Sequence, residues 1–418
     1  MISQRLLVLG VLCLAAMISQ FYRAANSILA APVMAELELP PAAYGTLTAT
    51  FFFAFMLTQF PAGMFFDRYG PRLTISGFML FAIAGALVFA FGNSFLALTF
   101  ARALLGIGCA TIVMGAFMVI SFWFEPRYFA MMSSIIIATS HLGNLLATAP
   151  LAFAIERVGW RASIGALAGI SVLVLLLVFL VVRDGPKRAA PSRSASGWVD
   201  TLKGLRRVMA MRDIQRAFAL ALVCYPSMIT ILGLWGGAYL HSAFGLNSIE
   251  IGKVLMVMPA CSLIGSLCYG PLDQLFNSRK FAVLAGVVPL GGMLITLGLL
   301  PSPSLTTVTF VLAAIAFFAA SGMLIIAHGR GLVPDHLAGR AITTINVGVI
   351  GGAALFQFAS SLLLDFFIGS DGIVSLAGFR LLFTLMGSLV LCAVLIYLPA
   401  RDVHPRQLTR TGEADTGS

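Results

Sequence analysis

Long apolar runs and short polar gaps alternate along almost the whole chain. A helix that crosses a bilayer needs about 20 apolar residues. Twelve runs of this kind can be counted, centred near residues 18, 55, 83, 108, 141, 172, 227, 261, 290, 317, 353 and 388. The gaps between them are short except at Arg183 to Arg216, a stretch rich in Arg, Lys, Ser and Ala. The pattern predicts an all-α membrane protein with twelve transmembrane helices.

The long polar gap predicts the domain organisation. We expect an N-terminal six-helix bundle at residues 1–182, a cytoplasmic linker at 183–214, a C-terminal six-helix bundle at 215–400 and a cytoplasmic tail at 401–418. The first apolar run could be mistaken for a secretory signal. It lacks a convincing small-residue cleavage site, and the count of twelve needs it, so we expect it to be the first spanning helix.

Composition and charge agree with a membrane protein and predict its orientation. Sixty per cent of the residues are hydrophobic and only 10% are charged, far from the balance of a soluble domain. Twenty of the 26 Lys and Arg fall in gaps on one side of the predicted membrane and only four on the other. Because cytoplasmic loops carry the excess of basic residues, we expect a multi-pass protein of the cell (inner) membrane with both termini in the cytoplasm. The net charge of +10 then reflects topology, and no nucleic-acid partner is expected without a basic soluble domain.

One polar gap carries a recognisable motif. The segment Gly63-Met64-Phe65-Phe66-Asp67-Arg68-Tyr69-Gly70-Pro71-Arg72 separates the second and third apolar runs. Its charges cannot be left in hydrocarbon, so we expect a hairpin of about ten residues at the cytoplasmic surface. The pattern G-x-x-x-D-R-x-G-x-R resembles the loop between helices two and three of the major facilitator superfamily of membrane transporters.

Other segments extend this resemblance. Arg102-Ala103-Leu104-Leu105-Gly106-Ile107-Gly108 is similar to a helix-four motif of the superfamily, and Gly159-Trp160-Arg161 resembles its turn between helices five and six. A faint repeat of the hairpin occurs at Gly270-Pro271-Leu272-Asp273. The resemblance implies two six-helix pseudo-repeats with a solute site near the membrane midplane. It also implies a conformational latch formed by Gly63, Asp67, Arg68, Gly70 and Arg72.

Arg23 is the first candidate for the solute site. We expect it about two turns below the outer end of the first helix, where a cation costs at least ~2.5 kcal/mol unless it is paired or hydrated. The segment around it, which includes Gln20 and Asn26, resembles helix one of organic-anion symporters in this superfamily. That resemblance implies that the arginine binds a substrate carboxylate or phosphate. The alternative is a structural arginine that bonds helix-terminal carbonyls or reaches the outer surface.

The fifth apolar run supplies a second polar face. Ser134, His141, Asn144 and Thr148 are spaced so that they share one side of a helix. His141 is the only histidine well inside a run, and no Asp or Glu lies in the core of any run. Because an unperturbed histidine titrates near pH ~6.5, we predict that His141 lines the solute site and carries a coupling proton. Arg102 is a second coupling candidate or a structural residue. Coupling through the substrate's own charge and uncoupled facilitated diffusion stay open.

The remaining polar candidates belong to the second half. Asn346 and Gln357 lie about three turns apart on one predicted helix and so share a face. We include them in the substrate site with Asn144 and Tyr225. The six cysteines have no C-x-x-C pair, and we expect them to be small buried packing residues. No metal site, cofactor or catalytic residue is predicted, because nucleotide-loop and catalytic-triad patterns are lacking.

Together these patterns predict a non-enzymatic secondary transporter of a small organic solute that works by alternating access. Drug and proton antiporters of the superfamily typically carry a Gly-Pro with closely spaced glycines in helix five. This chain instead reads His141-Leu142-Gly143-Asn144-Leu145-Leu146-Ala147-Thr148-Ala149-Pro150 there, which favours uptake, by symport or uniport. An organic anion is the expected substrate, and a neutral aromatic vitamin such as riboflavin is the alternative. A non-transporting membrane sensor is a further alternative, disfavoured by a tail of only 18 residues after Ala400. The expected partners are the small-molecule substrate, membrane lipid and coupling protons, and the expected state is a functional monomer.

Overall fold

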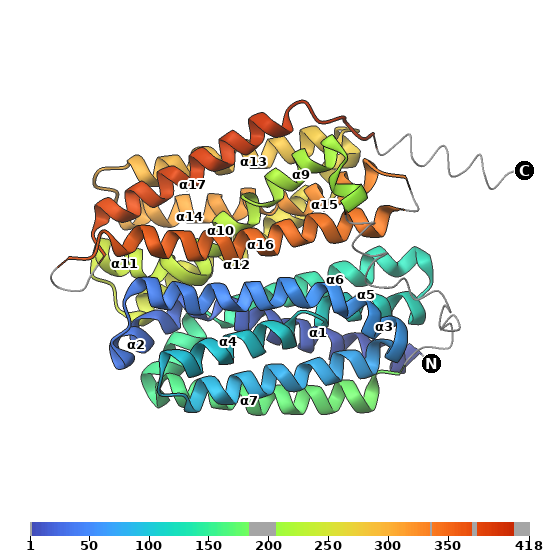
Figure 1. Cartoon of the computed structure of the whole chain (residues 1–418), viewed down its shortest axis with the longest axis horizontal. Coiled ribbons are helices and arrows are strands. Elements are labelled where there is room, and N and C mark those ends of the chain that lie inside the picture. The colour runs from blue at the N-terminus through green and yellow to red at the C-terminus, as the bar shows by residue number, and fades with distance from the viewer. Residues whose placement is uncertain (1, 184–205, 335–336, 370–373, 405–418) are drawn as a thin grey trace, which may run out of the picture. The chain divides into compact units, whose positions relative to one another are not determined.

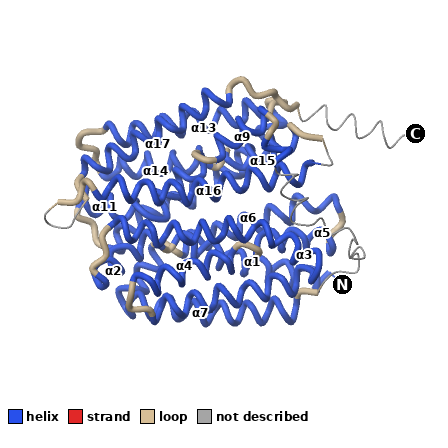
Figure 2. The backbone as a smooth tube through the Cα atoms, viewed as in Figure 1, coloured by secondary structure: helices blue, strands red, loops and turns tan. Residues whose placement is uncertain are grey.

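The described chain is built of helices. A computed structural model describes residues 2–183, 206–334, 337–369 and 374–404 (Figure 1). Apart from an isolated β-bridge between Ile368 and Val374, these residues form helices and their connections (Figure 2). Eleven of the described helices are long and apolar enough to cross a membrane, and a shorter apolar helix covers Met131–Leu146. A helix satisfies its own backbone groups, as hydrocarbon requires. The predicted all-α membrane fold is confirmed.

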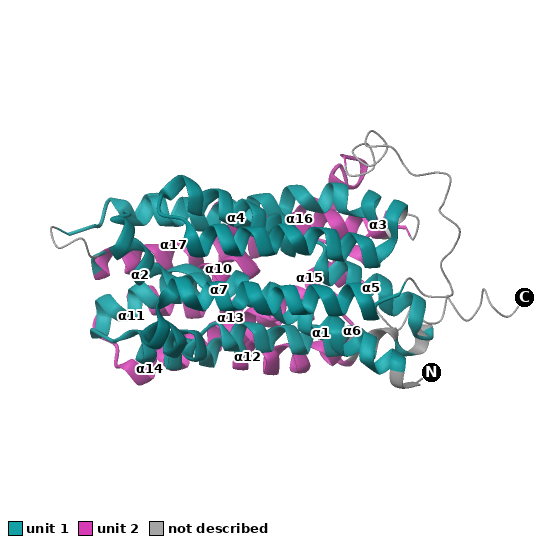
Figure 3. Ribbon diagram, turned by 90° about the horizontal axis from the view of Figure 1, so that it is seen from below, with its two compact units in different colours: residues 1–195, 231–259, 357–375 teal, residues 196–230, 260–356, 376–418 magenta. Residues whose placement is uncertain are grey.

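The chain divides into two compact units (Figure 3). The first comprises residues 1–195, 231–259 and 357–375, and the second comprises 196–230, 260–356 and 376–418. The first unit therefore contains the predicted N-terminal helices together with two whole helical elements and parts of two others from later in the sequence. The predicted bundles at 1–182 and 215–400 remain a prediction, and residues 184–205 of the linker and 405–418 of the tail lie outside the described residues.

The first helix of unit 1 is longer than the sequence predicted. α1 (Ile2–Ala24) is followed, after a break at Ala25, by α2 (Asn26–Leu37). Arg23 thus lies fourteen residues before the end of α2, which is about four helical turns. The expected depth of two turns was wrong, because the helical path continues in α2 through Pro32 to Leu37.

The predicted hairpin is shorter than expected. α3 (Pro41–Phe91) contains two spanning helices joined at Gly70, where φ is 79° and ψ is 168°. Such a positive φ favours glycine, and Pro71 is suited to the first turn of the next helix. Gly63, Asp67 and Arg68 continue the preceding helix, so a turn of ten residues was wrong; the side chain of Asp67 lies outside the described part. The Arg72 Nε donates to the carbonyl of Phe179 at 2.8 Å.

The rest of the first half follows the predicted order. α4 (Phe95–Cys109) and α5 (Ile112–Trp123) form the fourth span. α6 (Pro126–Leu146) ends at a break over Ala147 and Thr148, just before Pro150 in the first turn of α7 (Ala149–Val181). Inside α7 the chain reverses at Gly159, where φ is 80°. The turn predicted at Gly159-Trp160-Arg161 is therefore confirmed, and the fifth span consists of α6 and the first turns of α7.

The second half supplies elements to both units. Unit 1 receives η1 (Ile231–Trp235, a π-helix), α11 (Gly236–Phe244), the first part of α12 (Ser248–Leu275) and the end of α16 (Ala338–Asp365). Unit 2 holds α9 (Arg212–Ala221), α10 (Cys224–Thr230), α13 (Arg279–Leu299), α14 (Leu305–Ala319), α15 (Gly322–Gly331), α17 (Leu376–Tyr397) and the remaining parts of α12 and α16. α12 begins with a capping box, in which Asn247 Oδ1 accepts from the Glu250 N–H and Glu250 Oε2 accepts from the Asn247 N–H.

The cysteines only partly match their predicted role. Cys13, Cys109 and Cys224 are buried as expected, but Cys268 and Cys392 are exposed on the surfaces of α12 and α17. The expectation was wrong for these two because a spanning helix also presents small apolar residues to lipid.

Candidate functional site

The predicted polar residues of helices one and five meet where α6 crosses α1. A Cβ atom placed on Gly143 would collide with the carbonyl of Met17, so the two backbones touch at this point. Gln20 lies one turn beyond Met17, and His141 and Asn144 flank Gly143. Gln20 Oε1, His141 Nδ1 and Asn144 Oδ1 are buried and have no hydrogen-bond partner among the described residues. These atoms need partners, because an unsatisfied buried polar atom is costly.

Arg23 lies one turn further along α1. Only 8% of the residue is exposed. Its guanidinium carbon lies 4.9 Å from the centroid of the Phe55 ring, and its Nε has no hydrogen-bond partner. Within the described residues no carboxylate forms an ion pair with it. A stacked aromatic ring compensates a cation only partly, so the guanidinium keeps a capacity to bind an anion.

Asn26 adds a further unsatisfied group just after the helix break. The residue is fully buried, and neither Oδ1 nor Nδ2 has a partner among the described residues. Its backbone carbonyl is occupied, because the phenol of Tyr44 donates to it at 2.7 Å. The side-chain amide is therefore available for a bound solute while its backbone is held.

Side chains of neighbouring helices bond to the residues beside the break in helix one. Arg102 Nη1, from α4, donates to the carbonyl of Tyr22 at 3.3 Å, and the Arg102 guanidinium lies 4.6 Å from the Phe89 ring centroid. The Tyr22 hydroxyl and the Ser171 hydroxyl of α7 are 3.0 Å apart. Arg102 is only 2% exposed. Its Nε has no hydrogen-bond partner among the described residues. A structural role and a role in coupling both stay predictions for Arg102.

The candidates from the second half are distributed over both units. Gln357 belongs to unit 1, is fully buried, and has no partner for either side-chain polar atom among the described residues. Tyr225 and Asn346 belong to unit 2, where each is half-buried. Their place in the solute site stays a prediction. No group of three or more His, Cys, Asp and Glu in the described part could hold a metal ion.

Sequence reasoning missed Tyr44. It stands in the first turns of an apolar run, and a phenol buried in such a place usually has a hydrogen-bond partner. That signal could have singled out the residue, but its partner is a backbone carbonyl eighteen residues away. A sequence pattern does not indicate which carbonyls a helix break leaves available.

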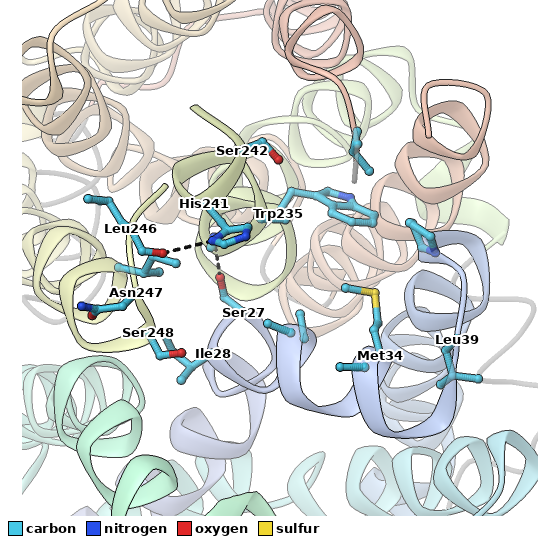
Figure 4. Close-up of a pocket in the computed structure, with 18 of the residues that line it drawn as sticks. Ser27, Ile28, Met34, Leu39, Trp235, His241, Ser242, Leu246, Asn247 and Ser248 are labelled. Atoms are coloured by element: carbon cyan, nitrogen blue, oxygen red, sulfur yellow. Dashed lines mark hydrogen bonds between the residues drawn. The ribbon is translucent and has the colours of Figure 1, made fainter. Parts of the chain in front are cut away.

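A separate cavity of about 670 Å³ lies in unit 1 between α2, the start of α3, α11 and the start of α12 (Figure 4). We call it the α2–α11 cavity. The hydroxyl of Ser27 accepts from the Gly237 N–H at 3.1 Å, which joins α2 to α11 at its wall. His241 Nδ1 lies 3.1 Å from the Leu246 carbonyl and donates to it. None of the predicted solute-site residues lines this cavity.

Comparison with known proteins agrees with this fold. The model of the Major Facilitator Superfamily matches residues 12–357. The hexuronate transporter of Escherichia coli is 24% identical over 410 residues, which are 91% of this chain and 92% of that protein. The nitrate/nitrite transporter NrtP of Picosynechococcus is 27% identical over 335 residues, covering 69% of this chain and 61% of that protein. An inward-facing, unoccupied structure of a bacterial homologue of the human lysosomal transporter Spinster shares the fold, with a TM-score of 0.78 and 18% identity over 95% of this chain and 97% of that one.

Proposed function

The chain belongs to the Major Facilitator Superfamily of membrane transporters, and we propose that it imports a small organic anion by alternating access, with Arg23 binding the anionic group. The observation that carries this proposal is the state of Arg23. Only 8% of the residue is exposed, its Nε has no partner, and no described carboxylate pairs with it.

A bound anion would offset the free-energy cost of burying the unpaired charge of Arg23. An isolated charge inside a membrane protein is expensive, and such residues usually pair or mark a substrate path. The guanidinium fork matches the geometry of a carboxylate or phosphate. The amide oxygens of Gln20, Asn26 and Asn144 are buried without a partner and are suited to accept from the hydroxyl groups of a polar organic acid.

The relatives support an anion over a neutral solute. Hexuronate, nitrate and nitrite, which name two of the related transporters, are all anions. The neutral aromatic alternative, such as riboflavin, would leave Arg23 uncompensated when bound. We therefore rank it second.

The proposal also includes the membrane in which the protein lies and its orientation there. We propose that the chain lies in the cell (inner) membrane with both termini in the cytoplasm, because the basic residues are concentrated on that side. We propose a functional monomer in which His141 carries the coupling proton. Tyr225, Asn346 and Gln357 complete the substrate site in this proposal, and Gly63, Asp67, Arg68, Gly70 and Arg72 form the latch.

Uptake by purified protein in proteoliposomes tests the proposal. The panel should contain hexuronates, other small organic acids and riboflavin. We expect saturable uptake of an acid that Arg23→Ala abolishes and that Arg23→Lys restores poorly, because lysine keeps the charge but loses the fork. Arg157→Ala, which removes an exposed arginine of α7, is the matched control. Normal acid uptake by Arg23→Ala at equal incorporation, or uptake of riboflavin alone, would contradict the proposal.

A further inference from the structure

The α2–α11 cavity is built like a ligand site and lies apart from Arg23. Its volume of about 670 Å³ falls within the range of small-molecule pockets. Apolar side chains make much of its wall, among them Ile28, Met34, Leu39 and Ile251. We propose that this cavity is a second binding site, which takes an organic cation with an apolar body.

The charge of the lining selects a cation. Glu38 and Glu156, both exposed, are the charged residues of the lining, which contains no Lys or Arg. Neither glutamate forms an ion pair within the described residues. His241 adds a polar group, which donates through Nδ1 to the backbone carbonyl of Leu246. The polar groups are thus complementary to a positive ligand.

The backbone of Glu38 supplies an independent observation. Glu38 follows the end of α2 with φ 50° and ψ 40°, in the left-handed region. Glycine is the usual residue at this point of a helix, because it adopts the conformation without strain. A glutamate here carries a cost in stability, and residues held in this way cluster at functional sites.

A bound cation would also connect elements from the two halves of the sequence. Ser27 of α2 and Gly237 of α11 already meet at the cavity wall, and Ile251 of α12 adds to the lining. A ligand that fills the cavity adds contacts between the same elements. Alternating access requires contacts of this kind to break once per cycle. Resting on the proposed transport function, the inference is that a bound cation slows transport without competing for Arg23.

Calorimetric titration of the purified full chain with benzyltriethylammonium tests binding without any transport step. The neutral compound of the same shape, in which carbon replaces the nitrogen, is the ligand control. We expect saturable binding of the cation and much weaker binding of its neutral counterpart. Glu38→Gln and Glu156→Gln should each weaken binding roughly two- to fivefold, as for partly exposed charge pairs. Absence of saturable binding, or equal binding of both compounds, would overturn the proposal.

Two further variants separate binding from folding. Glu38→Gly removes the carboxylate and relieves the positive φ, so it should weaken binding as Glu38→Gln does while the melting temperature stays unchanged or rises. Glu250→Gln is the matched control, because Glu250 lies nearby on α12 outside the cavity lining and glutamine preserves the capping box. If Glu38→Gly binds benzyltriethylammonium with unchanged affinity, or if Glu250→Gln loses as much affinity as Glu38→Gly, the binding site does not lie in this cavity.

Uptake assays then test the effect on transport. Benzyltriethylammonium should lower the maximal rate of acid uptake while leaving its KM unchanged, and Glu38→Gly should relieve this inhibition. Inhibition that raises KM alone would place the cation at the solute site and overturn the proposal. Binding of the cation without any inhibition of uptake would overturn the inference that the bound cation connects α2, α11 and α12 and so slows transport. Failure to find an anionic substrate would leave the calorimetric result standing, so the two proposals fail separately.

Discussion

The phenol of Tyr44 donates a 2.7 Å hydrogen bond to the backbone carbonyl of Asn26, three residues beyond Arg23. Arg102 donates to the carbonyl of Tyr22, the residue just before Arg23. The two bonds bracket the arginine, one on each side of the break at Ala25. We infer that Tyr44 and Arg102 position the proposed solute-binding arginine, Arg23, through its backbone.

Tyr44→Phe should therefore weaken the binding of the anionic substrate. Loss of one buried hydrogen bond is worth about 1 kcal/mol, so we expect roughly a fivefold rise in KM with a smaller change in kcat. Uptake kinetics in proteoliposomes measure both. Tyr22→Phe is the control, because it removes a phenol of similar burial that bonds Ser171 and not a carbonyl at the break. An equal rise in KM for both variants would contradict the positioning role.

A double-mutant cycle sharpens this prediction. If Tyr44 acts through Arg23, Tyr44→Phe should have little further effect on KM when Arg23 is already lysine. Additive effects would indicate that the two residues act independently. An unchanged KM in Arg23→Lys alone would instead contradict the proposed role of the arginine.

Gly143→Ala should destabilise the fold at the crossing of α1 and α6. The added Cβ meets the Met17 carbonyl, and overpacking of this kind costs about 1–3 kcal/mol. The melting temperature in detergent should fall, and substrate affinity should fall with it because Gln20, His141 and Asn144 move. Gly165→Ala is the matched control, since nothing lies within 4 Å of the Cβ position there. Its melting temperature should stay unchanged or rise slightly. If Gly143→Ala keeps the melting temperature of the wild-type protein, the backbones of α1 and α6 do not touch at Gly143 and Met17 as the structure shows.

The helices were predictable because hydrocarbon leaves the backbone little choice. Each apolar run had to become a helix, and the motif around Gly70 indicated where two helices reverse. The depth of Arg23 was not predictable, because the break at Ala25 carries no proline or glycine signal and α2 continues past Pro32. Tyr44 and the α2–α11 cavity depend on contacts between segments remote in sequence. Such contacts leave no periodic pattern.

Asp402 lends itself to a test of pH dependence outside the membrane spans. Burial raises its pKa, but hydrogen bonds from the Ser278 hydroxyl and the backbone N–H groups of Lys280 and Val403 outweigh this effect and leave the pKa below its usual value. A carboxyl with a lowered folded pKa stabilises the fold above its unfolded pKa, about 3.9, and loses this effect as the pH falls through the folded pKa.

Asp402→Asn should accordingly lower the melting temperature at neutral pH. We expect a loss of about 1 kcal/mol, because the carboxylate is partly exposed and asparagine can still accept hydrogen bonds. The difference from the wild-type protein should narrow below about pH 4. Asp365→Asn, an exposed aspartate at the end of α16, should change little at any pH. A constant difference across the pH range would mean that Asp402 stabilises the fold by its shape and not by its charge.

The proposed coupling role makes His141 the subject of the last prediction. His141 Nδ1 is buried without a described partner beside Asn144, and no Asp or Glu lies in the core of the predicted spans. His141→Gln keeps hydrogen-bonding capacity but cannot titrate near neutral pH. The variant should still exchange labelled substrate across a proteoliposome membrane at a rate near that of the wild-type protein, yet lose accumulation driven by an imposed pH gradient.

Wild-type protein that never accumulates substrate would indicate a facilitator with His141 as a polar wall residue. A glutamine variant that concentrates substrate normally would place coupling elsewhere, with Arg102 and the ionisation of the substrate as the next candidates.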